Sequence, residues 1–285
     1  MKKWAFQVHQ KRVPDRVVNF LQDIFVFKRG RSGDLHRMFP LIFSSDERNY
    51  CLVLKEGTHV VGTLLLRKVP HGEFTLGLVG FVATAEHRRG LGVASRLLTE
   101  LDRLALQEQI GAGLLWTSKH ALYEKRGWRQ QNLFPTQVLS PTGQERGLSV
   151  IPAPNGKILF QLAKQYGQFS WRTKRDFILL AGLSQHIHFG TIGSYLLKRG
   201  KQALGYAIVG NNRHVLEIVG ERSEWSLCFN ALGSFLNTKE LISQANGRGW
   251  TEFLQEDRLT MVKVFNENFD RVRLKTVSLS PLDRI

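Results

Sequence analysis

The hydrophobic and polar positions in the first part of the chain follow the periods that mark strands and helices. Residues 4–9 alternate as a strand does, and residues 14–27 place apolar side chains at helical spacing. Two extended segments, 50–54 and 59–68, meet at a hairpin signal, and a third follows at 74–84. The pattern therefore predicts a strand, a helix and then three antiparallel strands.

A leucine-rich stripe then predicts a long helix over residues 91–109. An apolar run at 112–117 predicts a buried strand, and residues 120–125 predict a short helix that ends at Gly127. A further strand is expected at 128–134. The fold class is thus α/β (α+β), with a mixed, mostly antiparallel sheet flanked by helices.

The second half of the chain repeats this order in a weaker form. Residues 140–157 are rich in Pro and Gly and are the expected linker, which places one domain at 1–145 and another at 155–285. Extended segments at 195–209 and 215–219 resemble the hairpin and the third strand of the first half. We interpret the chain as two tandem domains.

The turn after the third extended segment differs between the halves. In the first half it reads His87-Arg88-Arg89-Gly90-Leu91-Gly92-Val93 and opens the leucine-rich helix. Glycines let consecutive N–H groups point into one concavity, and a helix N-terminus favours the same anion, so this turn predicts a phosphate site. The second half has Gly220-Glu221-Arg222-Ser223-Glu224 before a helix expected at 225–236. Its two carboxylates would repel a phosphate, so the second copy is expected to be degenerate.

Other phosphate-binding folds fit the first turn poorly. A dinucleotide site needs a third glycine where Ser95 stands, and it needs a βαβ unit rather than hairpins. A Walker loop needs Gly-Lys-Ser/Thr, which does not follow. A solvated charged turn without a ligand stays an alternative for Arg88 and Arg89.

Composition and charge narrow the class of protein. The 285 residues are 42% hydrophobic and 22% charged, which is typical of a globular protein with a core. The net charge of +16 is spread over both halves and attracts polyanions, among which coenzyme A and nucleic acid both qualify. We expect no signal peptide and no membrane span, and we expect Cys51 and Cys228 to be buried free thiols, which favours a cytoplasmic location.

Together, the turn and a second segment resemble the GNAT superfamily of acetyltransferases. The cofactor motif of that family is Arg/Gln-x-x-Gly-x-Gly/Ala, and its glycines match Gly90 and Gly92, although His87 stands where Arg or Gln is usual. The strand before it ends in Thr84 instead of the usual proline. The second motif is matched at Ala121, Tyr123, Glu124, Lys125 and Gly127, with Trp128 in place of Phe. More loosely, the two halves resemble tandem-GNAT proteins of the enhanced-intracellular-survival type, whose third domain would not fit within this chain.

The resemblance implies acetyl-CoA as co-substrate and gives its binding residues. The pantetheine arm would lie along a strand at Phe81, Val82, Ala83 and Thr84. The pyrophosphate would sit on the amides of Gly90, Leu91, Gly92, Val93, Ala94 and Ser95, with charge supplied near His87 by Arg88 and Arg89. Ser118 and Lys119 match family positions near the end of the arm.

The implied reaction assigns two catalytic groups. The N–H of Val82 or of its neighbour, where a bulge would separate the strands, would donate to the thioester oxygen. Tyr123 would protonate the departing thiolate, unless it is merely a packing residue. The general base is open: residues 76–80 contain no Glu, Glu73 lies upstream, and a base in the other half or water remains an alternative.

The expected function is direct transfer of an acetyl group from acetyl-CoA to an amine acceptor, either a small molecule or a protein. The alternatives are a transferase with another acyl donor and a non-catalytic binder of nucleic acid or another polyanion. His186 and His188 have no third ligand at suitable spacing, so we expect no metal site.

Overall fold

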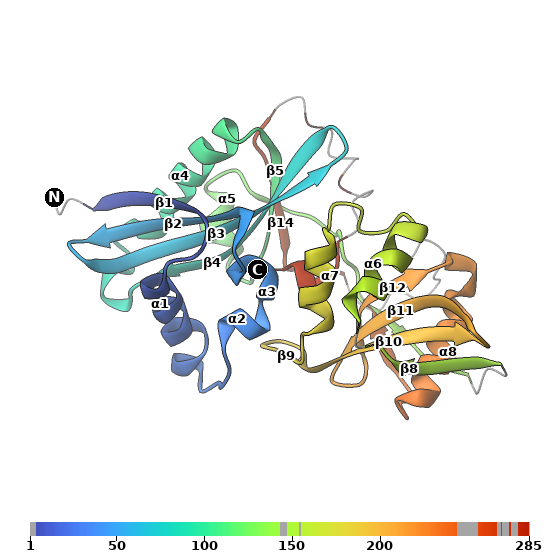
Figure 1. Ribbon diagram of the computed structural model, residues 1–285. Coiled ribbons are helices and arrows are strands. Elements are labelled where there is room, and N and C mark those ends of the chain that lie inside the picture. The colour runs from blue at the N-terminus through green and yellow to red at the C-terminus, as the bar shows by residue number, and fades with distance from the viewer. Residues whose placement is uncertain are drawn as a thin grey trace. The chain divides into compact units, whose positions relative to one another are not determined.

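A computed structural model describes residues 4–142, 147–153, 155–243, 256–266, 269, 274 and 279–284. The chain divides into two compact units. Unit 1 comprises residues 1–131, 258–275 and 284–285, and unit 2 comprises residues 132–257 and 276–283. Each unit is built on one sheet, and helices pack against it (Figure 1).

The sheet of unit 1 has the strand order β1-β2-β3-β4-β5-β14-β6. Its neighbouring strands are antiparallel except β4 and β5, which are parallel. The strands are β1 Ala5–Lys11, β2 Asp46–Glu56, β3 His59–His71, β4 Phe74–Thr84, β5 Ile110–Trp116, β6 Arg129–Gln130 and β14 Thr260–Val264.

Helix α4 of unit 1 covers one face of this sheet, and the first helices cover the other (Figure 1). The leucine stripe of α4 is buried against β2 and β3, where Leu97, Leu101, Leu52 and Leu64 have no exposed surface. This burial follows from the 3.6-residue period of the helix and explains the long apolar stripe of the sequence. The helices are α1 Asp15–Phe25, η1 Phe27–Arg29, α2 Leu35–Met38, α3 Pro40–Phe43, η2 Glu86–Arg88, α4 Val93–Gln107 and α5 His120–Glu124.

Unit 2 has the strand order β7-β13-β12-β11-β10-β8, and β9 pairs with β10. Only β12 and β13 are parallel. The strands are β7 Gln137–Leu139, β8 Leu148–Pro152, β9 Gln185–His186, β10 Gly190–Arg199, β11 Gln202–Gly210, β12 His214–Gly220 and β13 Leu241–Ser243. The helices are α6 Gly156–Gln165, α7 Lys174–Ala181, η3 Arg222–Glu224, α8 Trp225–Phe235 and η5 Pro281–Asp283.

Two strands, β7 and β14, depart from the expected contiguous domains. β7 follows the strands of unit 1 in sequence but pairs with β13 in unit 2. β14 follows the strands of unit 2 but lies between β5 and β6 in unit 1. The compact units therefore differ from the expected contiguous division at 145 and 155, because strands more than a hundred residues apart in sequence pair. The assignment of separate functions to the two domains stays a prediction.

The predicted fold class is confirmed: the chain is a mixed α/β protein with two sheets flanked by helices. Two local predictions were wrong. The strand expected at 128–134 spans only Arg129–Gln130, and the expected linker at 140–157 contains strand β8 and the start of α6. In both places, pairing with a distant strand decided the structure, and the local Pro and Gly content did not.

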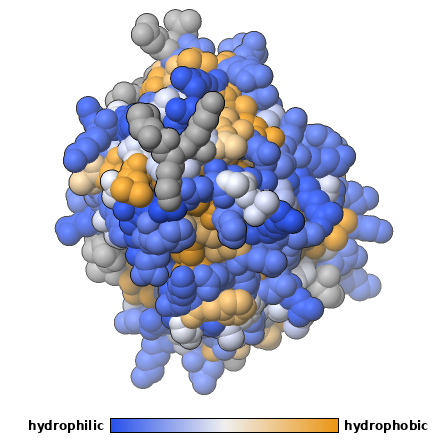
Figure 2. Space-filling view, turned by 90° about the vertical axis from the view of Figure 1, so that its left-hand side faces the viewer, coloured by the Kyte–Doolittle hydropathy of each residue, from blue (hydrophilic) through white to orange (hydrophobic). Residues whose placement is uncertain are grey.

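Three further findings concern the described ranges. Cys51 and Cys228 are buried free thiols, as predicted. No described helix is long and apolar enough to cross a membrane. The described residues contain no group of three or more His, Cys, Asp or Glu side chains that could hold a metal ion. Figure 2 shows one face of the molecule, which is largely hydrophilic with smaller hydrophobic areas between the polar side chains.

Candidate active site

The glycine-rich turn of unit 1 adopts the backbone that its sequence predicts. Gly90 and Gly92 have φ angles of 77° and 87°, in the left-handed region that favours glycine. An added Cβ would meet no atom within 4 Å at either position, so backbone conformation rather than space requires glycine. Gly92 is the N-cap of the 15-residue helix α4, and no side chain caps that helix. The first amides of α4 therefore remain available to an anion.

The two arginines of this turn have different surroundings. Arg88 donates from Nε and Nη2 to the Glu56 carboxylate at 2.9 and 2.5 Å, which fixes the turn to the β2–β3 hairpin. Arg89 is 62% exposed, and its guanidinium lies 3.9 Å from the Glu86 carboxylate. Of the two arginines, Arg89 is thus the more accessible to a ligand. Glu56 was missed by the sequence reasoning because 32 residues separate it from Arg88 and no local pattern connects them.

An open groove of about 1020 Å³ lies beside the turn in unit 1. Its walls come from α1, from the β2–β3 hairpin and from residues 85–89. Cations and carboxylates both line it, and several are paired, such as Lys28 with Asp23 at 3.1 Å. The charged lining residues are Arg16, Asp23, Lys28, Glu56, Glu86, Arg88 and Arg89.

Strands β4 and β5 pair over only part of their length. The parallel ladder runs from Thr75–Ile110 to Leu78–Leu114 and ends there, while β4 continues to Thr84. Residues 79–84 of β4 thus have no strand partner on this side within the described part of unit 1. A ligand that lies along the strand in such a wedge could pair with the backbone groups of β4 that β5 does not reach.

A β-bulge interrupts the pairing of β4 with β3 at the same level. Thr63 pairs with Ala83 and Leu65 pairs with Gly80, so Phe81 and Val82 face Leu64 alone. Phe81 carries the distortion, with a φ of 47° that is unusual for a residue other than glycine. The bulge expected at Val82 is therefore present.

Tyr123 lies on the short helix α5 and is only 7% exposed. Burial raises the pKa of its phenol to about 12, so the hydroxyl is neutral at physiological pH. Its ring packs edge-on against Trp128, with ring centroids 6.2 Å apart. Tyr123 belongs to the hydrophobic cluster of unit 1 against which Val82 packs, and Val93 from the start of α4 belongs to the same cluster. The strand, the turn and the tyrosine helix thus converge on one core.

The C-terminal strand β14 supports this core from the side of β5. Met261 of β14 has no exposed surface and lies in the same cluster as Tyr123. The N–H of Thr117 donates to the Leu259 carbonyl at 2.9 Å, and the Thr117 Oγ1 accepts from the N–H of Lys119 at 3.0 Å. The segment before β14 therefore holds the loop that contains Ser118 and Lys119, whose side chains are exposed. Sequence reasoning missed β14 because nothing in its local pattern indicates its partner.

Comparison with known proteins identifies this unit. Residues 15–128 match the acetyltransferase (GNAT) family. This part of the chain is a GNAT acetyltransferase domain. No curated protein gives a significant match to the sequence.

Solved structures share the fold over almost the whole chain. A probable N-acyltransferase from Enterococcus faecalis superposes with a TM-score of 0.67 at 11% identity, covering 92% of this chain and 73% of its own. A tandem GNAT protein from the clavulanic acid biosynthesis pathway gives 0.58 at 13% identity, with coverages of 94% and 100%. Eis1 from Mycobacterium abscessus gives 0.58 at 12% identity, with coverages of 91% and 74%. At these identities the likeness shows the fold alone, and that fold includes tandem arrangements.

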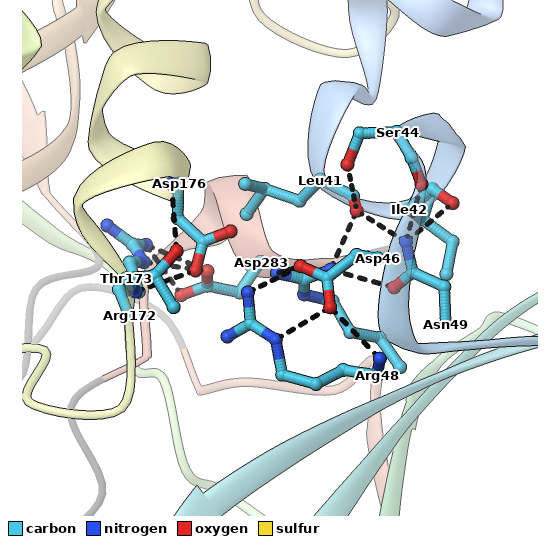
Figure 3. A network of polar contacts seen from close by, with 11 residues as sticks. Leu41, Ile42, Ser44, Asp46, Arg48, Asn49, Arg172, Thr173, Asp176 and Asp283 are labelled. Carbon is cyan, nitrogen blue, oxygen red and sulfur yellow. Dashed lines mark hydrogen bonds and ion pairs between the residues drawn. The ribbon is translucent and has the colours of Figure 1, made fainter. Parts of the chain in front are cut away.

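Glu73, the carboxylate considered as a general base, and Glu217, on the strand of unit 2 that corresponds to β4, have different surroundings. Glu73 precedes β4, nine residues before Val82, which corresponds to about 30 Å along a strand. Glu217 in unit 2 has a fully buried side chain, accepts from Arg172 at 2.7 Å and accepts from the Tyr206 hydroxyl at 2.5 Å. Arg172 also donates to both oxygens of the Asp283 carboxylate, toward which its guanidinium is directed in Figure 3. The Glu217 carboxylate is therefore engaged within the buried network of unit 2.

Proposed function

We propose that the GNAT domain transfers the acetyl group of acetyl-CoA directly to an amine. One observation carries the proposal: the bulged end of β4, which has no strand partner on its β5 side, leads into a left-handed glycine turn at an uncapped helix N-terminus. The extended strand end suits a pantetheine arm that adds its own hydrogen bonds, and the turn suits the pyrophosphate. The backbone of Phe81, Val82, Ala83 and Thr84 would bind the arm, and the amides from Gly90 to Ser95 would bind the phosphates.

In the proposed reaction, the amine nitrogen attacks the thioester carbon, the carbon–sulfur bond breaks, and the amine loses a proton to water. The N–H of Val82 stabilises the negative charge that develops on the carbonyl oxygen. Tyr123 gives its proton to the departing sulfur. A phenol of pKa about 12 is a weaker acid than a thiol near ~8.5, and full transfer would cost about 5 kcal/mol in water. The same buried surroundings raise the pKa of a thiolate held beside Tyr123, which reduces that difference.

A thiol-release assay with acetyl-CoA and a panel of amines tests the proposal. Tyr123→Phe should lower kcat by on the order of 10²–10⁴-fold. Tyr195→Phe removes a partly buried phenol of unit 2 and should leave kcat unchanged. Because the pKa of Tyr123 is raised to about 12, its ionisation should add no falling limb to the pH profile below about pH 11. A Tyr123→Phe enzyme of full activity would exclude the assigned role.

The acyl group and the acceptor stay open within this proposal. Assays with longer acyl-CoA thioesters would separate an acetyltransferase from a transferase that uses another donor. The net charge of +16 favours polyanion binding as a second candidate function. Salt-sensitive RNA binding, together with no thermal shift on adding acetyl-CoA, would support that candidate instead.

A further inference from the structure

The strained residue of the bulge, Phe81, is enclosed by other aromatic rings. The rings of Phe25, Phe39 and Phe43 all meet the Phe81 ring edge-on, at centroid distances of 5.2, 5.0 and 5.2 Å. Phe81, Phe39 and Phe43 are each less than a tenth exposed. Edge-to-face pairs of this kind are favourable beyond the area that they bury. Three such contacts on one side chain fix the direction in which Phe81 leaves the strand.

Two of the enclosing rings, Phe39 and Phe43, flank a helix that hydrogen bonds fix to the sheet. Phe25 ends α1, Phe39 joins α2 to α3, and Phe43 ends α3. The side-chain amide of Asn49 donates to the carbonyls of Leu41, Ile42 and Ser44 at 2.8, 3.1 and 3.0 Å, respectively (Figure 3).

The buried Arg67 guanidinium adds a second restraint on α3. It donates to the Leu41 carbonyl and to the Asn49 side-chain oxygen, both at 2.7 Å. Helix α3 and the two phenylalanines at its ends therefore have one position relative to β2 and β3.

A left-handed phenylalanine is unfavourable on its own and persists only where its surroundings impose it. We propose that Phe25, Phe39 and Phe43 act as an aromatic clamp that holds Phe81 in this conformation and so positions the Val82 amide. The three residues are positioning residues, because they act on the reaction through the bulge. The role in catalysis rests on the proposed acetyl transfer, whereas the clamp itself does not.

The first test is kinetic. Phe39→Leu and Phe43→Leu keep apolar volume but remove a ring contact, and each should lower kcat about tenfold, a fraction of the loss typical for a missing oxyanion donor. The KM for acetyl-CoA should rise by a smaller factor than kcat falls, because the strand end that binds the arm loosens but the turn that binds the phosphates is untouched. Phe160→Leu removes a comparable ring contact with Phe177 in unit 2 and is the matched control, with unchanged kcat.

The same substitutions in a Phe81→Gly protein distinguish a positioning role of the rings from a general effect on stability. Glycine adopts a positive φ without a clamp, so Phe81→Gly removes the need for it. Phe43→Leu should then cost about tenfold in the wild-type background and less than about twofold in the Phe81→Gly background. Equal losses in both backgrounds, or full activity of Phe39→Leu and Phe43→Leu, would overturn the clamp.

Amide hydrogen exchange tests the clamp without any activity. Phe39→Leu and Phe43→Leu should speed exchange across residues 79–84 at least about tenfold, whereas Phe160→Leu should not. Should wild-type protein release no thiol with any amine, the proposed function fails and this measurement still decides on the clamp. Unchanged exchange across 79–84 in both variants would refute it.

Discussion

The central strands of the two units follow the same order, β2-β3-β4-β5 in unit 1 and β10-β11-β12-β13 in unit 2. The units differ in the turn that follows β4 and β12. In unit 1 that turn has two left-handed glycines and leads to an α4 N-terminus without a side-chain cap. In unit 2, Glu224 stands before α8 and pairs with Arg199 at 2.7 Å. The last amide of β12, that of Gly220, donates to the Gln168 side chain at 3.1 Å. Helix α8 also lacks a side-chain cap, so the two turns differ in their glycines, in the carboxylates around them and in the Gly220 amide, which is paired within unit 2.

The strand before the turn also differs between the units, because β4 is bulged near its end and β12 is regular there. In unit 2, β11 and β12 pair without interruption from Gly205–Gly220 to Ile208–Glu217. The irregularity of β12 falls instead at Leu216, further from the turn. Where unit 1 has the bulge at Phe81 and Val82, unit 2 has a regular ladder and the buried Glu217. A common fold therefore becomes a candidate active site where backbone groups of one strand lack a strand partner.

Removal of β14, which unit 1 takes from the end of the chain, should have the largest effect on unit 1. A fragment of residues 1–145 keeps every sequence motif of the GNAT domain but lacks β14. Loss of the buried Met261 alone should cost roughly 2–5 kcal/mol, a large part of the 5–15 kcal/mol that typically stabilises a domain. We expect the fragment to show no cooperative thermal unfolding and no binding of acetyl-CoA. A fragment that unfolds and binds like the full chain would show that β14 is dispensable.

Reversing the charge of one arginine in each turn tests whether only the turn of unit 1 binds the phosphates. Arg89→Glu places a carboxylate beside the expected phosphates and should raise the Kd of acetyl-CoA about tenfold at low ionic strength, and less at 1 M salt because the charges are then screened. Arg222→Glu makes the same change in the corresponding turn of unit 2 and should leave the Kd unchanged. Calorimetric titration of both variants at two salt concentrations measures the difference. Equal effects would mean that the ligand responds only to net charge.

These features divide into those that local sequence carries and those that it does not. The glycine turn, the leucine helix and β4 itself follow from residue types and periods within a dozen positions, and all were predicted. The partner of Arg88, the position of β14 and the rings around Phe81 depend on residues that are far apart in sequence. A local pattern contains no information on such pairings, because the tertiary fold alone brings the partners together. The same limit explains why β8 was mistaken for part of a linker.

Each unit also buries an arginine, Arg67 in unit 1 and Arg172 in unit 2. Cations outnumber carboxylates in the first group of charges, and carboxylates outnumber cations in the second. In unit 1, the Asp46 carboxylate meets two cations, Arg48 at 2.6 Å and Arg67 at 3.4 Å. Burial alone would raise the pKa of Asp46, but the hydrogen bonds from Arg48 and the charge of Arg67 hold it well below its usual range. In unit 2, one cation, Arg172, meets the two carboxylates of Glu217 and Asp283.

The excess carboxylate makes the stability of unit 2 depend on pH. Burial raises the pKa of Asp283 to about 6 against the opposing charge of Arg172, whereas an unfolded Asp titrates near ~3.9. The folded state thus binds the proton more tightly, so this contribution is complete below about pH 4 and is lost as the pH rises through about 6. The loss is at most on the order of 3 kcal/mol. The paired carboxylate of Asp46 acts in the opposite direction, because its contribution is lost only as the pH falls below about 4.

Asp283→Asn imitates the protonated side chain and should remove this dependence. Urea unfolding of wild type should show a free energy of unfolding that falls between pH 4 and 7, relative to the Asp283→Asn protein at each pH. Using the difference between the two proteins cancels the other titrating groups, and Asp176→Asn, which removes another buried carboxylate of unit 2, controls for the loss of an acidic side chain. A difference that stays constant across this range would mean that Arg172 keeps both carboxylates ionised. The buried network of unit 2 would then tolerate two negative charges around one cation, and the contrast with unit 1 would lie only in geometry.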